Sequence, residues 1–326
     1  MNVWGHYSFH VRGPRLDFED ISQALNLQPT KIVPMPRVYS EDLGQLIPGH
    51  QVPSGVLPAG MRLTEGWLYS RSYDKTVIDV STVFVALLTD LRPRAQAIRG
   101  LRGRSDVTDV YVLASFQSDY AQMRFELPRE IIQGLHELGT QLGIGIVSDG
   151  DPPDGAQALD SVTGADGVLS WDLTGSFILG VRGYDVNWGG MLDWDGITAL
   201  VGLSPTQTLK CGEDSYGHVR PNGWFHERPF ALRAINGEWD TDRMVDVLMG
   251  LLRDLGPRVS SIRALNRRPD VTSFTIECHL RSAAREIHFD LPLAAIERLD
   301  ALDVGLTFEV LSGGLEWNED NGDTTE

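Results

Sequence analysis

The sequence predicts an α+β protein made of two homologous α/β-sandwich repeats, each a mainly antiparallel sheet with helices on one face. Residues 87–110 (LLTDLRPRAQAIRGLRGRSDVTDV) align without gaps to residues 251–274 (LLRDLGPRVSSIRALNRRPDVTSF), and 13 of these 24 positions are identical. Agreement over such a stretch indicates a duplicated domain. Both copies give the predicted element order β-α-β-α-β-β-α-β, which is typical of helices packed on one face of an antiparallel sheet.

The first half of each repeat begins with a strand, predicted at 5–12 in the first copy. A helix is expected at 17–26, with its counterpart at 193–202, and each helix ends before a proline. A long loop rich in Pro, Gly and polar residues follows. The next strand is expected at 65–71 in the first copy and at 229–234 in the second, so that Phe230 takes the place of Trp67.

The second half of each repeat begins with its longest helix. Leucine, valine and isoleucine recur there at helical spacing, and Pro93 and Pro257 must kink or divide the helix because proline removes a hydrogen-bond donor. Alternating apolar residues at 110–116 and 123–127, repeated at 274–280 and 287–291, predict a hairpin with one buried face. Leu-Pro then opens another helix, and a last strand is expected at 143–148 or 304–310.

Composition and charge predict the domain boundaries. We expect a first repeat at 1–150, an acidic Gly/Pro linker at 151–166, a second repeat at 167–314, and an acidic disordered tail at 315–326. The net charge of −17 is unevenly spread: the linker and tail together carry −9 of it. Since phosphate contacts need a basic surface, nucleic-acid binding is disfavoured.

The chain has no basic n-region, no long apolar run and only two cysteines. These features predict a soluble, cytoplasmic, bacterial-type protein with two ordinary cores, no membrane span and no disulfide framework. We expect equivalent surfaces of the repeats to pack together around a pseudo-twofold axis, leaving the chain a monomer or weak homodimer.

Four short patterns point to a known family. They are the helix-ending motifs at 27–30 and 202–206, a strand containing Trp67, the LL-x-x-L-x-P helix and the late Leu-Pro step. Together they resemble a bacterial domain-of-unknown-function family, DUF4279, present as a tandem duplication over most of the chain. The resemblance implies no activity, cofactor or catalytic residue.

Two groups of residues are candidates for chemistry. Cys211, His218 and His226 are zinc-ligand types, but their spacing matches no compact zinc signature, so an irregular polar loop is the favoured interpretation and no metal or cofactor is predicted. His279 and His288 fall on the polar face of the second predicted hairpin, among carboxylates. This arrangement fits a solvated sheet face, a charged recognition face, or acid/base chemistry.

The loops at 31–64 and 207–228 are the favoured binding surface, because they differ in length while the scaffold around them repeats. Lysine is scarce in this chain, yet both loops carry basic residues, so we expect them to converge on one anionic ligand or acidic partner. The residues proposed for binding are Lys31, Arg37, His50, Lys210, His218, Arg220 and His226.

No catalytic motif is present, so a non-catalytic partner-binding module, of an immunity or stress-related type, is the favoured function. Two alternatives stay open. One is a sensor of a small anion or metabolite that uses the basic loops, and the other is an enzyme with an unrecognised site near Cys211, His218 and His226.

Overall fold

A computed structural model gives the structure of the protein. It describes residues 3–34, 37–40, 45–48, 64–73, 80–148, 162–163, 169–170, 172–183, 192–209, 212–213, 219–220, 222–235, 238–239, 241–284 and 286–315. The predicted linker (151–166) and tail (315–326) lie almost entirely outside these residues, so the expectation that they are poorly packed stays a prediction.

One six-stranded and one seven-stranded sheet form the scaffold, the seventh strand being the short β16 (Glu238–Trp239), which pairs with β15. The first sheet has the order β18-β8-β6-β1-β5-β2, and the second has the order β7-β19-β17-β11-β15-β12. In each sheet one neighbouring pair, β6 with β8 and β17 with β19, is parallel, and the other pairs are antiparallel. The two orders correspond strand for strand, as a duplication requires.

The strands of the first sheet are β18 (Glu286–Leu291), β8 (Gln141–Ser148), β6 (Asp109–Ser118), β1 (Val3–Gly13), β5 (Glu65–Tyr73) and β2 (Lys31–Val33). Those of the second are β7 (Gln122–Leu127), β19 (Leu306–Leu315), β17 (Val271–Ala284), β11 (Asp172–Gly183), β15 (Asn222–Ile235) and β12 (Gln207–Leu209). Short strands β3 (Arg37–Ser40), β4 (Gln45–Pro48), β9 (Val162–Thr163), β10 (Leu169–Ser170), β13 (Gly212–Glu213), β14 (Val219–Arg220) and β16 (Glu238–Trp239) complete the described strands.

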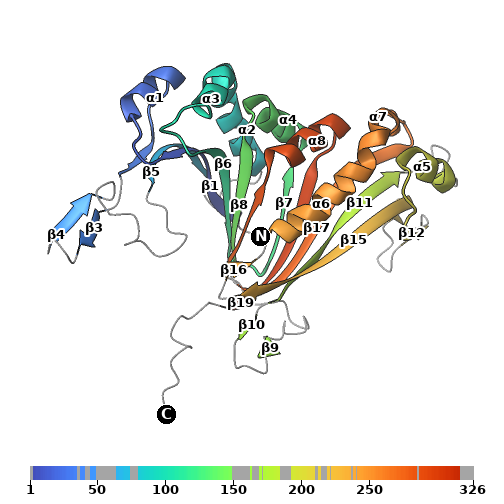
Figure 1. The fold of residues 1–326 in the computed structure, drawn as a ribbon. Helices are drawn as coiled ribbons and strands as arrows, with labels where there is room; N and C mark the ends of the chain where they lie inside the picture. Colours follow the sequence, from blue (N-terminus) through green and yellow to red (C-terminus); the bar gives the residue numbers. More distant parts are fainter. Residues whose placement is uncertain are drawn as a thin grey trace, which may run out of the picture.

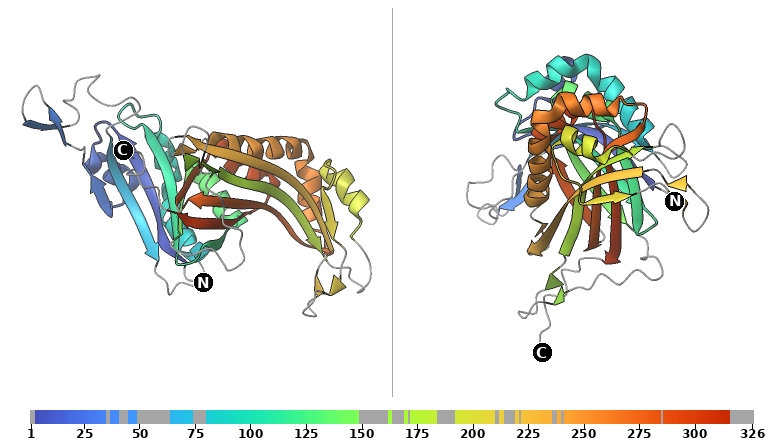
Figure 2. Two further views of the ribbon diagram at one scale, coloured as in Figure 1. Left: turned by 90° about the horizontal axis from the view of Figure 1, so that it is seen from below. Right: turned by 90° about the vertical axis from the view of Figure 1, so that its right-hand side faces the viewer.

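The helices lie together along one side of both sheets (Figure 1), as the end-on view in Figure 2 also shows. The α-helices of the first repeat are α1 (Phe18–Leu25), α2 (Val80–Leu91), α3 (Ala95–Leu101) and α4 (Arg129–Leu138), and those of the second are α5 (Trp194–Val201), α6 (Thr241–Leu255), α7 (Val259–Asn266) and α8 (Leu293–Leu302). Strand residues alternate between the two sides: in β6 every second side chain is buried. The predicted α+β class is therefore confirmed. We call the face of each sheet opposite the helices its open face.

The predicted division of the long helix is confirmed in both repeats. Short 3₁₀ segments, η2 (Arg92–Arg94) and η3 (Gly256–Arg258), separate α2 from α3 and α6 from α7. Pro93 and Pro257 lie in the first turn of these segments, where the missing proline N–H breaks the α-helical bonding pattern.

A buried tryptophan anchors the first helix of each repeat to its sheet. Trp67 lies opposite Val11 and donates from Nε1 to Ser22 Oγ at 2.9 Å. Trp224 lies opposite Val181 and donates to Thr198 Oγ1 at 3.1 Å. Trp224 is therefore the counterpart of Trp67, and the sequence alignment to Phe230 is wrong. The loop before this strand is shorter in the second repeat, and the strand itself is longer, which hid the match.

The predicted hairpins are wrong in their pairing. β7 follows β6 closely in the chain but pairs with β19 of the other repeat, with Phe125 opposite Phe308. Likewise β18 pairs with β8, with Phe289 opposite Ile144. Each repeat therefore completes its sheet with a strand from the other. The buried faces of these strands were predicted correctly, because β7 and β18 each bury every second residue. However, a pattern of buried and exposed residues does not specify which strand lies next to it.

The exchange joins the repeats through equivalent surfaces, as expected for a pseudo-twofold arrangement. Helices α4 and α8 pack against each other, and His136 Nδ1 lies 2.7 Å from Asp300 Oδ2, its own counterpart 164 residues later. The Phe125 ring stacks on Phe116 at 4.0 Å and on Phe308 at 4.8 Å. Contrary to the expectation of two cores, the buried side chains of both repeats form one continuous cluster.

Candidate functional site

The residues proposed for binding from the sequence are only partly described. Lys31 is exposed on β2 and His226 is half-buried on β15. Arg37 is in β3 and Arg220 is in β14. His50, Lys210, Cys211 and His218 lie outside the described residues. Their role in binding stays a prediction.

The two described members of this group do not come together. Lys31 is in the outermost strand of the first sheet, and His226 is next to the outermost strand of the second. Figure 1 shows β5 and β12 at opposite ends of the molecule. The expected convergence is therefore wrong for Lys31 and His226. The physical reason is the strand exchange, which places β7 and β18 at the centre and turns both outer edges away from each other.

His226 has a structural role in this conformation. Its Nδ1 is 2.7 Å from the Ser204 carbonyl, so this nitrogen carries the proton and donates. Its Nε2 then accepts from Arg228 Nε at 3.3 Å, and Arg228 also binds Asp254 at 2.5 Å. Both ring nitrogens are engaged, so His226 has no free lone pair for a metal. Among the described residues, no group of three or more His, Cys, Asp or Glu side chains is placed to hold a metal ion.

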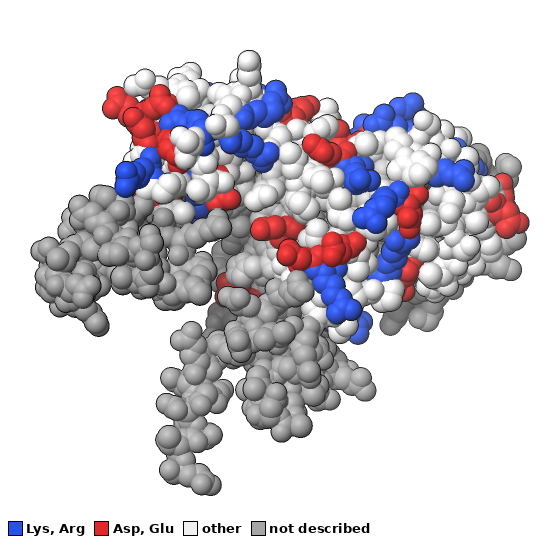
Figure 3. All heavy atoms as spheres, in the orientation of Figure 1, with Lys and Arg blue, Asp and Glu red and all other residues white. Residues whose placement is uncertain are grey.

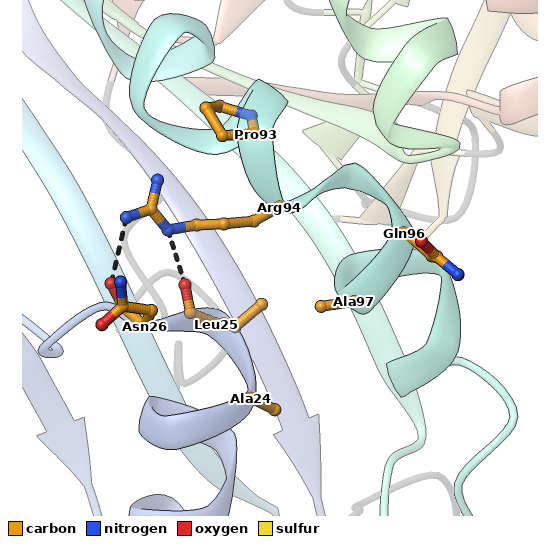
Figure 4. A pocket seen from close by; sticks show the side chains of 7 residues that line it. All are labelled: Ala24, Leu25, Asn26, Pro93, Arg94, Gln96 and Ala97. Carbon is orange, nitrogen blue, oxygen red and sulfur yellow. Dashed lines mark hydrogen bonds between the residues drawn. The ribbon is translucent and has the colours of Figure 1, made fainter.

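A hollow of 580 Å³ lies between α1 and the η2–α3 segment (Figure 4). The Arg94 guanidinium is its one charged group, and it donates to three backbone carbonyls: Leu25 at 2.5 Å, Asn26 at 3.0 Å and Asp90 at 2.6 Å. These bonds satisfy carbonyls at the ends of α1 and α2. Since each guanidinium nitrogen donates to a backbone carbonyl, Arg94 serves to join the ends of the helices at this hollow.

The two histidines expected to form one cluster are separated by the strand exchange. His279 is on β17 in the second sheet, whereas His288 is on β18 in the first and lies 2.6 Å from Glu286. His279 has more polar neighbours than His288 on the open face of its sheet. His279 Nε2 lies 3.5 Å from Glu277 Oε2 and 3.7 Å from Glu309 Oε2.

This network extends across four strands of the second sheet. Arg182 on β11 binds Glu277 at 2.8 Å, and Gln122 on β7 donates to Glu309 at 3.0 Å. A hollow of 150 Å³ opens beside His279, Gln122, Glu309 and Leu311. Because Gln122 comes from the first repeat, the site is built jointly by both repeats. We call Gln122, Arg182, Glu277, His279 and Glu309 the open-face network.

Glu277 and His279 shift each other's pKa in opposite directions. The hydrogen bond with His279 lowers the pKa of Glu277 against the opposing effect of burial, and Arg182 lowers it further. The same hydrogen bond raises the pKa of His279, assisted by the charge of Glu309. Glu277 is 7 % exposed, so a nearly buried carboxylate is kept ionised on a face that no described helix covers.

The other nucleophile-type groups of the described chain are poorly placed for catalysis. Cys278 is fully buried, and burial raises the pKa of its thiol. Ser8 Oγ lies 2.6 Å from His10 Nε2, but both residues are buried and His10 Nδ1 has no orienting carboxylate. A serine nucleophile needs an accessible hydroxyl and a base oriented by a third group.

The fold and this site define a class: a tandem α+β repeat protein whose repeats exchange one strand and leave both sheets with an open face. Family comparison gives the particular assignment. The model of the domain of unknown function DUF4279 matches residues 4–148 and 187–312, so the chain belongs to this family and carries its domain twice. No curated protein and no solved structure matches the chain. No described helix is both long enough and apolar enough to cross a membrane.

The sequence pattern identified His279 among carboxylates on a polar strand face, but it gave no indication of Arg182, Gln122 or Glu309. Arg182 could have been found from the alternation of β11, which places it on the same face as Ile178 and Gly180. Gln122 and Glu309 could not, because their contact depends on the exchange of β7.

Proposed function

We propose that this protein is a non-catalytic partner-binding module and that the open face of the second sheet is its binding surface. The observation that carries the proposal is Glu277, a carboxylate that is 7 % exposed and ion-paired on a face without helices. Holding a charge in such a position costs desolvation energy, and the open-face network of four strands compensates for that cost. Preorganised charged groups of this kind favour specific recognition.

The surroundings of the network support a protein partner. Half-buried Phe225, Ile178 and Leu311 lie on the same face, and the Arg182 guanidinium lies 5.5 Å above the Phe225 ring. Arginine and aromatic side chains beside apolar ones are the composition enriched in protein interfaces. The helix side differs: in Figure 3, Lys and Arg side chains are interspersed with Asp and Glu over the helices, without a large area of one sign.

The mutual pKa shifts of Glu277 and His279 are those of an ion pair. The hydrogen bond with His279 lowers the pKa of Glu277, and the same bond raises the pKa of His279. A general acid or base works best with a pKa near the operating pH, so a carboxylate whose pKa is lowered is a weak general base at neutral pH, and binding is the better-supported role for Glu277. An immunity-type or stress-related role is the most concrete form of the proposal, and the nature of the captured partner would distinguish the two.

Charge reversal on the open face tests the proposal. Glu309→Lys changes the network, and Glu297→Lys makes the same charge change on an exposed position of helix α8. Tagged full-length proteins would capture partners from the native host, with proteins bound compared quantitatively by mass spectrometry. We expect a protein that is bound by the wild type and Glu297→Lys but lost from Glu309→Lys. Equal capture by both variants, or no specific capture by the wild type, contradicts the proposal.

A further inference from the structure

A second group of polar residues lies on the open face of the first sheet, away from the open-face network. Lys31, Leu68, His10 and Tyr111 are directly opposite one another across β2, β5, β1 and β6. Directly opposed residues share one face of a sheet. Since Phe9 and Val11 on the same strand are buried in the core, the intervening His10 points to the open face.

His10 carries a buried nitrogen without a partner. The residue is 4 % exposed, its Nε2 lies 2.6 Å from Ser8 Oγ, and its ring stacks on Tyr111 with centroids 4.7 Å apart. Its Nδ1 is buried and has no hydrogen-bond partner. Buried polar atoms are nearly always paired, so an exception calls for an explanation.

Two cations beside His10 also lack an acidic partner. Lys31 and Arg12 are exposed, and neither forms an ion pair with any described residue, although the chain has a net charge of −17. Arg12 instead lies 5.2 Å above the Tyr111 ring. Figure 2 shows this sheet from its helix-free side.

The other charged groups that face this cluster are few. His6 is on the same strand, and its pKa is lowered by burial and by the charge of Lys31. Asp109 lies opposite Arg12 in the register, and Asp109 and Asp290 are close enough to influence the Tyr111 hydroxyl. Neither carboxylate reaches an ion-pair distance from Arg12 or Lys31. Within the described part of the chain, the cluster therefore keeps a local positive charge.

The second repeat is an internal control for what the fold needs. The position of His10 is taken by Gly180, which lies opposite Phe225 and Thr275. Lys31 corresponds to Gln207, opposite Phe225. The same sheet thus forms without the imidazole and without the lysine. Arg12 does correspond to Arg182, but Arg182 is paired with Glu277. The basic cluster is therefore additional to the requirements of the scaffold.

We propose that the open face of the first sheet binds a small oxyanion, a carboxylate or phosphate group, through Arg12 and Lys31, with His10 Nδ1 as the hydrogen-bond donor beneath it. Arginine and lysine are the usual partners of such anions. Because Nδ1 is not exposed to solvent, the anion reaches it when the Arg12 and Tyr111 side chains move aside. The site is independent of the proposed partner-binding surface.

Binding should be linked to protonation. Burial, and then Arg12 and His6, lower the pKa of free His10 to about 4. A bound anion favours the imidazolium and raises this pKa, so the protein takes up a proton on binding. Affinity for an anion of constant charge, such as sulfate, is then expected to increase as the pH falls from about 7 to about 5.

Calorimetric titration of the full-length protein tests the site, with inorganic phosphate, acetate and sulfate as probes at constant ionic strength. The double variant Arg12→Gln/Lys31→Gln should lose at least about tenfold in affinity for the bound probe, which corresponds to roughly 1.4 kcal/mol. The matched control Arg253→Gln/Arg267→Gln removes the same charge from exposed positions in α6 and directly after α7, and it should bind as the wild type does. Comparison of phosphate with acetate identifies the ligand chemistry.

The variant His10→Gln tests the contribution of the imidazole independently of the two cations. We expect this variant to bind sulfate more weakly at about pH 5 and to lose the pH dependence. A wild type that binds none of the three probes up to about 10 mM overturns the proposal, as does equal weakening by both double variants. Retained pH dependence in His10→Gln overturns the role of His10. Thermal unfolding of each variant, with Lys31→Gln alone as a minimal change, shows whether the fold is intact.

Discussion

The strand exchange predicts that the two repeats unfold together, and Phe125→Ala is the sharpest perturbation of their connection. Phe125 is 3 % exposed on β7, and its ring lies between Phe116 of the first sheet and Phe308 of the second. Removing a buried phenyl ring leaves a cavity and typically costs about 3–5 kcal/mol. That is a large fraction of the roughly 5–15 kcal/mol that stabilises a domain. Loss of both ring contacts places the expected effect toward the upper end of this range.

Urea denaturation and native-state hydrogen exchange measure this effect. We expect one cooperative transition at lower urea, with amide protection falling by a similar free energy in the central strands β1 and β11, one in each sheet. Tyr120→Ala is the control, because its side chain is 49 % exposed in the connection just before β7 and should change stability by less than about 0.5 kcal/mol. Protection lost from one sheet alone, or two separated transitions, would refute the idea of a single shared core.

Two further predictions concern packing and pH. Gly183→Ala should prevent stable folding, because an added Cβ would lie 1.9 Å from the Asp270 carbonyl oxygen. The control Gly180→Ala should fold, because its added Cβ would be in ordinary contact with the Phe225 ring at 3.4 Å and Thr275 Oγ1 at 3.7 Å; circular dichroism distinguishes the two variants. His279→Gln should lower the melting temperature most at about pH 5–6 and progressively less toward pH 9. The pKa of His279 is raised in the folded state, so its interaction with Glu277 stabilises the protein fully below the ordinary imidazole pKa of 6.5, and this stabilisation is lost as the pH rises through the raised pKa. The pKa of Glu277 is lowered, so its carboxylate stays charged across this pH range. A calorimetric difference that is constant with pH contradicts this assignment.

Much of the fold could be predicted because it depends on local signals. The internal sequence repeat showed where the two copies of the domain lie. The alternation of apolar and polar residues identified the buried side of β7 and β18, and the missing N–H of proline predicted the helix breaks at Pro93 and Pro257. Each of these signals is contained in a short segment of chain. None depends on which segments meet in space.

Strand pairing is not a local property, and there the prediction failed. β7 presents the same alternating face whether it pairs with β6 or with β19, and only the closing of Phe125 against Phe308 distinguishes the two. The same exchange separates His288 from His279 and leaves β2 and β12 as the outermost strands of their sheets. Trp224 was missed for another reason: a change in loop length shifted the alignment. Its position opposite Val181 and its hydrogen bond to Thr198 show the equivalence with Trp67.

The pattern of what repeats and what differs separates scaffold from function. Paired groups at strand and helix ends occur twice: Arg104 binds Asp106, and Arg268 binds Asp270 in the same two-bond geometry. These contacts hold the turn that enters β6 or β17, so both copies need them. The shared contacts explain why the two sheets superimpose in strand order.

The open faces behave in the opposite way. In the aligned strands β6 and β17, Leu113 and Ser115 of the first repeat correspond to Glu277 and His279 of the second, and in β8 and β19 Gly145 corresponds to Glu309. Burying the Glu277 carboxylate on one open face and the His10 imidazole on the other costs desolvation energy. The scaffold needs neither group, because each is absent from the equivalent position of the other repeat. The same two-layer framework therefore presents two chemically distinct surfaces, an ion-paired one and a basic one. Two different ligands account for this asymmetry better than a single ligand shared between the repeats.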